Sequence, residues 1–197
     1  MSLDYVVLTS VDRDDLLDGG SNHIARCVSV SKRLSPNVVI EVLSPDFRGN
    51  LNHLDTLLDS GLDVFSQNIE TVKRLTHVVR DPRAGYQQTL KMLSHAHKKG
   101  FVSKSGMMLG LGEEKDEVIE TMKDLYHNGV KILTLGQYLR PTMNHLPVKK
   151  YIHPDEFSEY SHIGKKIGLE EVVAGPLIRS SYRADRAFMK LEETKNA

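Results

Sequence analysis

Cysteine and long apolar runs are scarce in this sequence of 197 residues, and neither sign of charge is in excess. The single cysteine, Cys27, excludes an internal disulfide and a metal site built from several cysteines of this chain, and it is typical of a reducing compartment. The longest apolar stretches fall far short of the roughly 20 residues that span a bilayer, and residues 1–10 do not resemble a signal peptide. We therefore expect no association with a membrane.

The charge balance argues against nucleic acid as a partner. Lys and Arg together number 26, as do Asp and Glu, so the net charge is zero and no global positive field exists. With 40% hydrophobic and 26% charged residues, the composition is that of an ordinary globular protein long enough to bury a core. No interdomain linker or low-complexity segment is present. We expect one domain over residues 1–197.

The chain is organised around the stretch Phe101–Glu114, FVSKSGMMLGLGEE. Its apolar, unalternating middle predicts a strand buried on both faces over Val102–Leu109. Gly110 and Gly112 then permit a sharp turn, and the glutamates that follow suit the N-terminus of a helix. Lys104 and Ser105 are polar residues inside this strand, which indicates either a strand of the core whose lysine extends its ammonium to the surface or a site at the centre of a parallel sheet.

Six candidate strands alternate with five helical crossovers along the chain. We expect the strands at Tyr5–Ser10, Val38–Leu43, Val64–Phe65, Phe101–Leu109, Ile132–Leu135 and Val172–Ala174. This alternation predicts an α/β fold with a parallel sheet. Because six units are fewer than the eight of a complete barrel, we expect a partial parallel (β/α) barrel.

Local patterns give further expectations. Ser21 is placed to cap the helix that follows it, and Cys27 lies on the apolar stripe of that helix, which favours a core residue over a reactive thiol. Helical stretches are also expected at 71–79 and 86–98. From the residues alone, Arg179–Tyr182 has the pattern of a helix start with serine caps.

Polar residues follow five of the predicted strands and lie within the fourth, and in parallel α/β folds ligands bind at the carboxyl ends of strands. The series comprises Asp12, Arg13, Asp14, Asp46, Arg48, Asn68, Glu70, Lys104, Ser105, Gln137, Tyr138, Arg140 and Arg179 to Tyr182. One such residue carries little information, but six successive strands with polar ends predict a functional face.

Three other kinds of site are considered: a phosphate-binding loop, a metal site and a Schiff-base lysine. Gly110 and Gly112 resemble a phosphate-binding loop, but Glu113 and Glu114 would place two anions where the phosphate should lie. His95 and His97 are two residues apart and do not share a helix face, which disfavours a metal site. Lys104 has a position that suits a Schiff-base lysine, and it equally suits a core lysine paired with a carboxylate.

Taken together, several stretches resemble the lipoyl synthase family of radical S-adenosylmethionine enzymes. They occur in family order over nearly the whole chain: VVLTSVDRDDLLDGG at 6–20, SPDFRG at 44–49, NIETV at 68–72, SKSGMMLGLGE at 103–113, LTLGQYLRP at 133–141, HLPV at 145–148 and GPLIRSSYRA at 175–184. The set is specific, although each stretch alone would be weak. The resemblance implies a radical SAM core domain with residues 175–197 as a cluster-ligating tail.

The resemblance also implies a reaction, cofactors and partners. Lipoyl synthases insert two sulfur atoms at C6 and C8 of an octanoyl group carried on a protein lysine. They use S-adenosylmethionine, a 4Fe–4S cluster that cleaves it and an auxiliary 4Fe–4S cluster that supplies sulfur. The implied partners are an octanoylated lipoyl-carrier protein, including the H protein type of the glycine cleavage system, and a reducing electron donor. The implied location is a bacterial cytoplasm, or a mitochondrion or plastid.

Site residues follow from the same resemblance. Ser180, the first serine of the RSSY stretch, is implied as an iron ligand of the auxiliary cluster, with Arg179 beside it offsetting the anionic ligands. The residues implied to bind S-adenosylmethionine are Asn68, Glu70, Lys104 and Gln137.

The sequence departs from the family at three points. Gln67 stands where the family usually has histidine, and Arg140 stands before Pro141 where glutamine is commoner. The family's two three-cysteine motifs lie upstream of the strand corresponding to Tyr5–Ser10, so this chain lacks them. We therefore expect an N-terminally incomplete barrel without its first strand, inactive alone. The alternative is a non-catalytic fragment that binds S-adenosylmethionine or a lipoyl-carrier protein.

Overall fold

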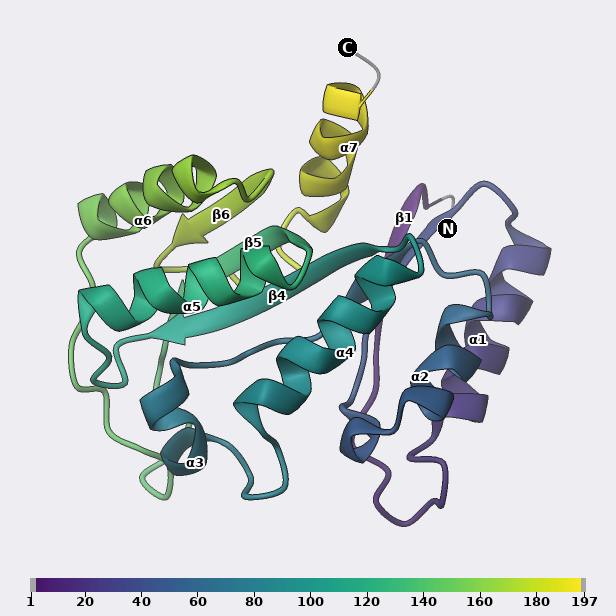
Figure 1. Cartoon of the computed structure of the whole chain (residues 1–197), viewed down its shortest axis with the longest axis horizontal. Helices are drawn as coiled ribbons and strands as arrows, with labels where there is room; N and C mark the ends of the chain where they lie inside the picture. Colours follow the sequence, from purple (N-terminus) through teal and green to yellow (C-terminus); the bar gives the residue numbers. More distant parts are fainter. Residues whose placement is uncertain (1–2, 196–197) are drawn as a thin grey trace.

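The computed structural model describes residues 3–195 and contains one sheet of six parallel strands, paired in the order in which they occur in the chain (Figure 1). The strands are β1 (Tyr5–Thr9), β2 (Val39–Leu43), β3 (Val64–Ser66), β4 (Val102–Leu109), β5 (Val130–Gln137) and β6 (Glu171–Gly175). The helices are α1 (Ser21–Leu34), α2 (Leu51–Leu58), α3 (Thr76–Val79), α4 (Tyr86–Lys98), α5 (Lys115–His127), α6 (Pro154–Ile167) and α7 (Ala184–Lys195), with short 3₁₀ turns at Phe47–Gly49 and Lys73–Leu75.

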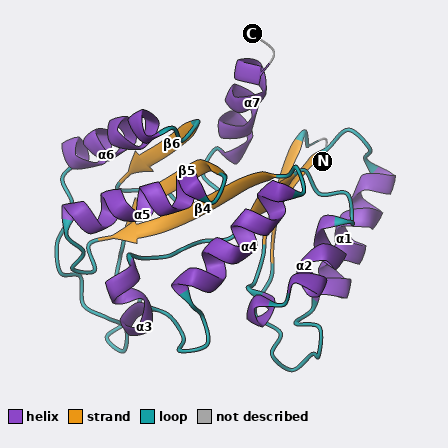
Figure 2. Cartoon of the chain, in the orientation of Figure 1, coloured by secondary structure: helices purple, strands orange, loops and turns teal. Residues whose placement is uncertain are grey.

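The predicted α/β fold and partial barrel are confirmed. Every neighbouring pair of strands is parallel, and β1 and β6 remain the two free edges of the described sheet. The crossover helices lie along one face of the sheet (Figure 2), and we call the opposite face, the interior side of the partial barrel, the concave face. Parallel pairing in this order brings the carboxyl ends of all six strands to one edge.

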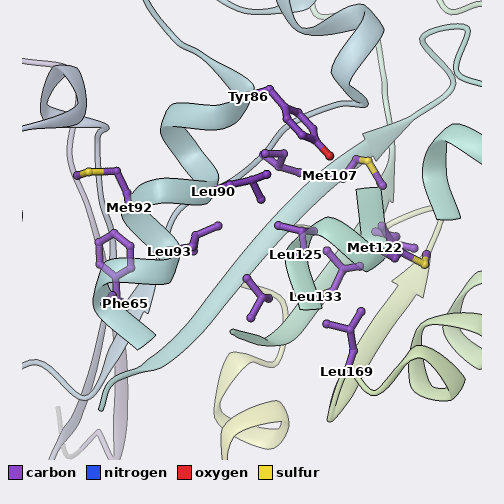
Figure 3. Close-up of a cluster of buried hydrophobic side chains, with 14 of the residues drawn as sticks. Phe65, Tyr86, Leu90, Met92, Leu93, Met107, Met122, Leu125, Leu133 and Leu169 are labelled. Carbon is purple, nitrogen blue, oxygen red and sulfur yellow. The ribbon is translucent and has the colours of Figure 1, made fainter. Parts of the chain in front are cut away.

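The hydrophobic core lies between the sheet and its crossover helices. Phe65 of β3 meets Met92 and Leu93 of α4, and Leu133 of β5 meets Leu125 of α5 (Figure 3). These side chains are fully or almost fully buried. Each such residue contributes roughly 1.5–3 kcal/mol through its removal from water, so this layer provides much of the driving force for folding.

Helix α7 does not belong to the outer layer. It follows the tail after β6 and packs between β6 and β1 at the amino ends of the strands (Figure 1). Ala187 and Leu191 form a small buried cluster with Ile132 of β5, and Phe188 lies 5.9 Å from Tyr5 between ring centroids. This helix therefore closes the floor of the concave face.

Two local predictions in the first crossover are wrong. Ser21 is the first residue of α1 and its hydroxyl makes no capping bond, because Asp18 already accepts from the backbone N–H groups of Gly20 and Asn22. Cys27 is exposed rather than buried, with its Sγ 3.8 Å from the Nε2 of His23.

Two other helix boundaries also differ from expectation. The stretch expected over 71–79 is divided into a 3₁₀ turn and the four-residue α3. The C-terminal helix begins at Ala184, so Arg179–Tyr182 lies in the preceding turn and does not cap it. This difference leaves Ser180 free to face the interior.

The docking of α7 gives the first testable prediction. Leu191→Asp places a charge in a buried apolar cluster, so we expect α7 to detach while the strand core persists. Hydrogen exchange should accelerate in residues 184–191 and remain slow in β4 and β5. The matched control is Met189→Asp on the exposed side of the same helix, which should leave exchange unchanged. Equal behaviour of the two variants would contradict this packing.

Candidate functional site

A cavity of about 420 Å³ opens at the carboxyl ends of β4 and β5. It brings together five of the six predicted site residues: Asn68, Glu70, Gln137, Arg179 and Ser180. Aliphatic and thioether side chains such as Met108, Leu111 and Ile178 form most of the remaining wall. The site therefore combines an apolar wall with a few converging polar groups, as ligand pockets commonly do.

A second, smaller hollow of about 190 Å³ adjoins the first and shares Asn68 and Glu70 with it. Its other walls come from the loops after β1 and β2, including Asp12 and Ser44. Gln67 also lines this hollow, is only 2% exposed, and has no hydrogen-bond partner for its side-chain nitrogen or oxygen. The sequence identified this position only as a departure from a family pattern, whereas its unpaired amide marks it as part of the site.

The segment 67–70 is held by β4 beyond the end of regular pairing. The hydroxyl of Ser105 donates to the Gln67 carbonyl at 2.9 Å and accepts from the Ile69 N–H at 3.1 Å, which brackets Asn68. Glu70 then bonds through its backbone to Gly106 and Met108. Ser105 was predicted inside this strand without an assigned role, and the structure shows that it positions segment 67–70.

Glu70 has an unusual backbone conformation and an unusual environment. Its φ of 67° lies in the left-handed region, which non-glycine residues adopt mostly where surrounding structure imposes it. Burial raises the pKa of Glu70, while a hydrogen bond from Asn68 and the charge of Arg80 oppose this rise. The carboxyl group thus titrates above the ordinary range of a glutamate and stays partly desolvated.

Two glycines keep the cavity open. A Cβ atom at Gly106 would lie 2.7 Å from the Oδ1 of Asn68 and 2.8 Å from the Oγ1 of Thr134. A Cβ at Gly136 would lie 2.2 Å from the carbonyl oxygen of Ile178. Side chains at either position would displace the polar groups or the tail that form the wall.

Gln137 contributes to the wall, but its amide is occupied by the neighbouring loop. Its Nε2 donates to the carbonyls of Tyr138 and Lys150, and its Oε1 accepts from the Ile152 N–H at 2.9 Å. In contrast, the Oδ1 of Asn68 is buried without a partner and remains available to a ligand.

Arg179 and Ser180 reach the cavity from the tail after β6. The guanidinium of Arg179 is exposed and donates to the Ile178 carbonyl at 2.8 Å, while Ser180 is half-buried at the wall. The same tail continues into α7, so the packing of that helix on the floor fixes the length of chain that spans the cavity.

The structure places Lys104 outside this cavity. Its ammonium is 1% exposed and donates to both carboxylate oxygens of Glu41, at 2.8 and 2.9 Å. Lys104 is level with Ser66 and Leu43, and Glu41 is two residues nearer the amino end of β2, so the ammonium points toward the floor. This is the carboxylate-paired lysine that the sequence also allowed.

Tyr5 completes the buried network below the cavity. Its hydroxyl donates to the Oε2 of Glu41 at 2.6 Å, and the same oxygen also accepts from the ammonium of Lys104. Burial and the neighbouring carboxylate raise the pKa of Tyr5, so the phenol remains a donor at neutral pH.

The phosphate-loop alternative is disfavoured by the same structure. The carboxylate of Glu113 accepts from the N–H groups of Gly110 and Leu111 at 2.5 and 2.9 Å. The donors that a phosphate would need are therefore already bound to an anion of the chain.

A metal centre is not formed by the described residues. No group of three or more His, Cys, Asp or Glu residues within 3–195 is arranged to hold a metal ion, and Cys27 lies exposed on α1. Within the same range, no helix is long and apolar enough to cross a membrane.

Sequence comparison links most of the chain to one group of proteins. A profile of the Radical SAM superfamily matches residues 1–125. Lipoyl synthase of Ectopseudomonas mendocina (strain ymp) is 59% identical over 192 residues, covering 96% of this chain and 55% of that protein. Chloroplastic lipoyl synthase 1 of Populus trichocarpa is 56% identical over 190 residues, covering 95% of this chain and 50% of that protein. The chain thus spans about half the length of the curated relatives it matches.

A solved structure shares the fold at low sequence identity. The match to the crystal structure of methylornithine synthase covers 98% of this chain and 67% of the methylornithine synthase chain, with a TM-score of 0.64 and 12% sequence identity. This likeness concerns the arrangement of strands and helices alone.

The buried ion pair gives a prediction about stability. Lys104→Ala leaves the Glu41 carboxylate buried without its cation, so we expect the free energy of unfolding to fall by about 3–5 kcal/mol. Urea denaturation measures this change. Lys115→Ala removes an exposed partner of Glu159 and should change the free energy by about 1 kcal/mol or less. Replacing all members of the network, Lys104→Met with Glu41→Leu and Tyr5→Phe, leaves no buried polar group unpaired and should recover most of the loss, and failure to do so would contradict the desolvation argument.

Proposed function

The chain belongs to the radical SAM superfamily, and from this premise we propose that it forms the substrate-binding and S-adenosylmethionine-binding part of a lipoyl synthase. The observation that carries the proposal is the 59% identity to a lipoyl synthase over 192 residues. The proposed activity is the insertion of two sulfur atoms, at C6 and C8, into an octanoyl group carried on a protein lysine.

S-adenosylmethionine fits the residues that converge on the cavity. In radical SAM enzymes, its reductive cleavage supplies the species that abstracts hydrogen from the substrate. The unpaired Oδ1 of Asn68 offers an acceptor, the carboxyl group of Glu70 is placed to bind the cationic cofactor, and the apolar wall suits its adenine. Gln137 supports this wall through the loop it binds, and Lys104 positions the strand below.

The 4Fe–4S clusters of the superfamily do not fit this chain alone. One exposed cysteine does not supply the three thiolates that such a cluster needs. We assign to the tail 175–197 a contribution of one oxygen ligand, the hydroxyl of Ser180, with Arg179 offsetting the charge of an anionic group at the wall.

The proposed partners and location follow from the activity. The substrate arrives on a lipoyl-carrier protein or domain, such as the H protein type, and an electron donor supplies the reducing equivalents. The matching relatives are bacterial and chloroplastic, so we propose a bacterial cytoplasm or an organelle as the location. The competing proposal, a non-catalytic protein that binds S-adenosylmethionine or the carrier, shares the same cavity.

Binding of S-adenosylmethionine should depend on the charge of Glu70. Since its pKa is raised above the ordinary value, lowering the pH from 7 to 5 neutralises it sooner than an ordinary glutamate, and affinity should fall. Calorimetry with the 197-residue chain and no iron measures this. Glu70→Gln should bind more weakly at pH 7 and lose the pH dependence, whereas Glu120→Gln on exposed α5 should behave as the wild type. Absence of binding by the wild type would contradict the proposed site.

Lipoyl formation tests the activity itself. A fusion of this chain to the part of the Ectopseudomonas mendocina relative outside the matched residues should convert an octanoylated carrier protein to its lipoylated form, detected by mass spectrometry. In that fusion, Ser180→Ala should lower sulfur insertion by about an order of magnitude or more and leave S-adenosylmethionine cleavage intact. The control is Ser181→Ala, at the exposed neighbouring position.

Two outcomes would count against these assignments. If the fusion cleaves S-adenosylmethionine and never forms lipoyl groups, the chain is a binder rather than a synthase. If Ser180→Ala abolishes cleavage as strongly as sulfur insertion, the tail serves the cofactor site and not sulfur transfer.

A further inference from the structure

Two segments at the mouth of the cavity carry an uneven share of charge. We call residues 139–151 and 177–183 the cationic rim. Together they contain Arg140, Lys149, Lys150, Arg179 and Arg183 and no Asp or Glu, although the whole chain has 26 residues of each sign. Members of both segments, including Leu139, His145 and Ile178, line the cavity, so the two segments form part of its wall, and Arg179 is the cation that lines it directly.

Most of these cations have no carboxylate partner in the described residues. Lys150 pairs with Glu156 at 2.7 Å. The guanidinium groups of Arg140 and Arg179 instead donate to backbone carbonyls, and that of Arg183 lies over the ring of Tyr182. The positive charge of the rim is therefore largely uncompensated within this part of the protein.

The loops on the other side of the sheet edge differ in this respect. There Asp14 pairs with both Arg48 and Arg83, Arg83 also pairs with Asp81, and a further pair lies nearby between Arg13 and Asp15. These charges neutralise one another. The excess of positive charge is thus specific to the rim and is not a general property of the loops at this edge.

Large apolar side chains are also exposed on the rim. The exposed fractions are 80% for Met143, 79% for Leu177 and 73% for Tyr151, and Leu139 and Tyr182 are exposed as well. Exposed apolar groups next to uncompensated charge are typical of a surface that a protein partner covers. A nucleic acid or a membrane would call for a broader, more continuous basic patch than five cations on a chain of zero net charge.

We propose that the cationic rim is the docking surface for the protein that carries the acyl group, and that this partner presents Asp and Glu side chains around its acylated lysine. The proposal rests on the proposed function, because it requires a substrate held on a protein. An acylated lysine reaches the cavity only if the surface around that lysine lies against the mouth. Complementary charge then fixes the orientation and speeds the encounter, while Met143 and Leu177 supply apolar contact.

The test measures binding of an octanoylated lipoyl-carrier domain, with acidic residues beside its lysine, to the 197-residue chain. Binding should weaken as NaCl rises from 50 to 300 mM, because the contact is charge-dependent. Lys149→Glu with Arg183→Glu should raise Kd roughly tenfold at 50 mM NaCl and flatten the salt dependence. The matched control, Arg26→Glu with Arg33→Glu on exposed positions of α1, should change Kd by about twofold or less.

Further measurements separate the possible outcomes. Leu177→Ser should weaken binding equally at both salt concentrations, since it removes apolar contact only. If the charge-reversal variant unfolds, the neutral pair Lys149→Gln with Arg183→Gln replaces it, with a smaller rise in Kd expected. No carrier binding by the wild type, or equal weakening by the rim and α1 variants, overturns the proposal. The proposal is also overturned if the wild type binds vesicles that contain anionic phospholipid but does not bind the carrier, and the rim variants lose the vesicle binding.

S-adenosylmethionine affinity distinguishes this proposal from the proposed function. If the rim variants bind S-adenosylmethionine like the wild type and bind the carrier like the wild type, only the docking surface is refuted. If the wild type binds neither S-adenosylmethionine nor the carrier, the proposed function and the docking surface are both refuted.

Discussion

The pairing of β4 with β3 on one side and β5 on the other is the interaction on which the rest of the molecule depends. Strand β4 carries the core contacts to the helix layer, the lysine of the buried ion pair and the groups that hold segment 67–70. Its hydrogen bonds to that segment continue beyond the end of β3. The cavity is therefore an extension of the sheet, and its polar groups stand on a rigid support rather than on a loose loop.

The concave face is arranged in levels from floor to mouth. At the floor, α7 packs on apolar residues of the strands; above it lies the network of Tyr5, Glu41 and Lys104; and at the top are Asn68 and Glu70. A buried ion pair of this kind gives little net stability compared with apolar packing, but it strongly disfavours arrangements that separate its members. It links β2 and β4 across β3, below the cavity.

Much of this fold could be predicted from the sequence, because each strand is a short apolar run and each helix has a periodic stripe and a clear end. The strand at Val102–Leu109 and the glycine turn after it were identified to the residue. Cys27 was misplaced since a stripe defines a face only to within a residue or two, and α1 is covered on a narrow arc. The cap at Asp18 was missed because its loop contains several equivalent acidic residues.

The candidate site was predictable in part for a different reason. Parallel topology alone brings strand ends together, so Asn68, Glu70 and Gln137 met as expected. The partner of Lys104 lies 63 residues away in the chain, and no local pattern reports such a contact. The unpaired amide of Gln67 and the bracket formed by Ser105 likewise arise from packing between distant segments.

The strictly sequential strand order has a consequence for biogenesis. Each strand pairs with the one synthesised just before it, so the sheet can grow one unit at a time as the chain leaves the ribosome, with a single helical crossover to close at each step. Helix α7 is the exception, since it contacts both β6 and β1. The element that ties β1 to β6 is made only after all six strands of the described sheet, and the tail that crosses the cavity is drawn into place after them.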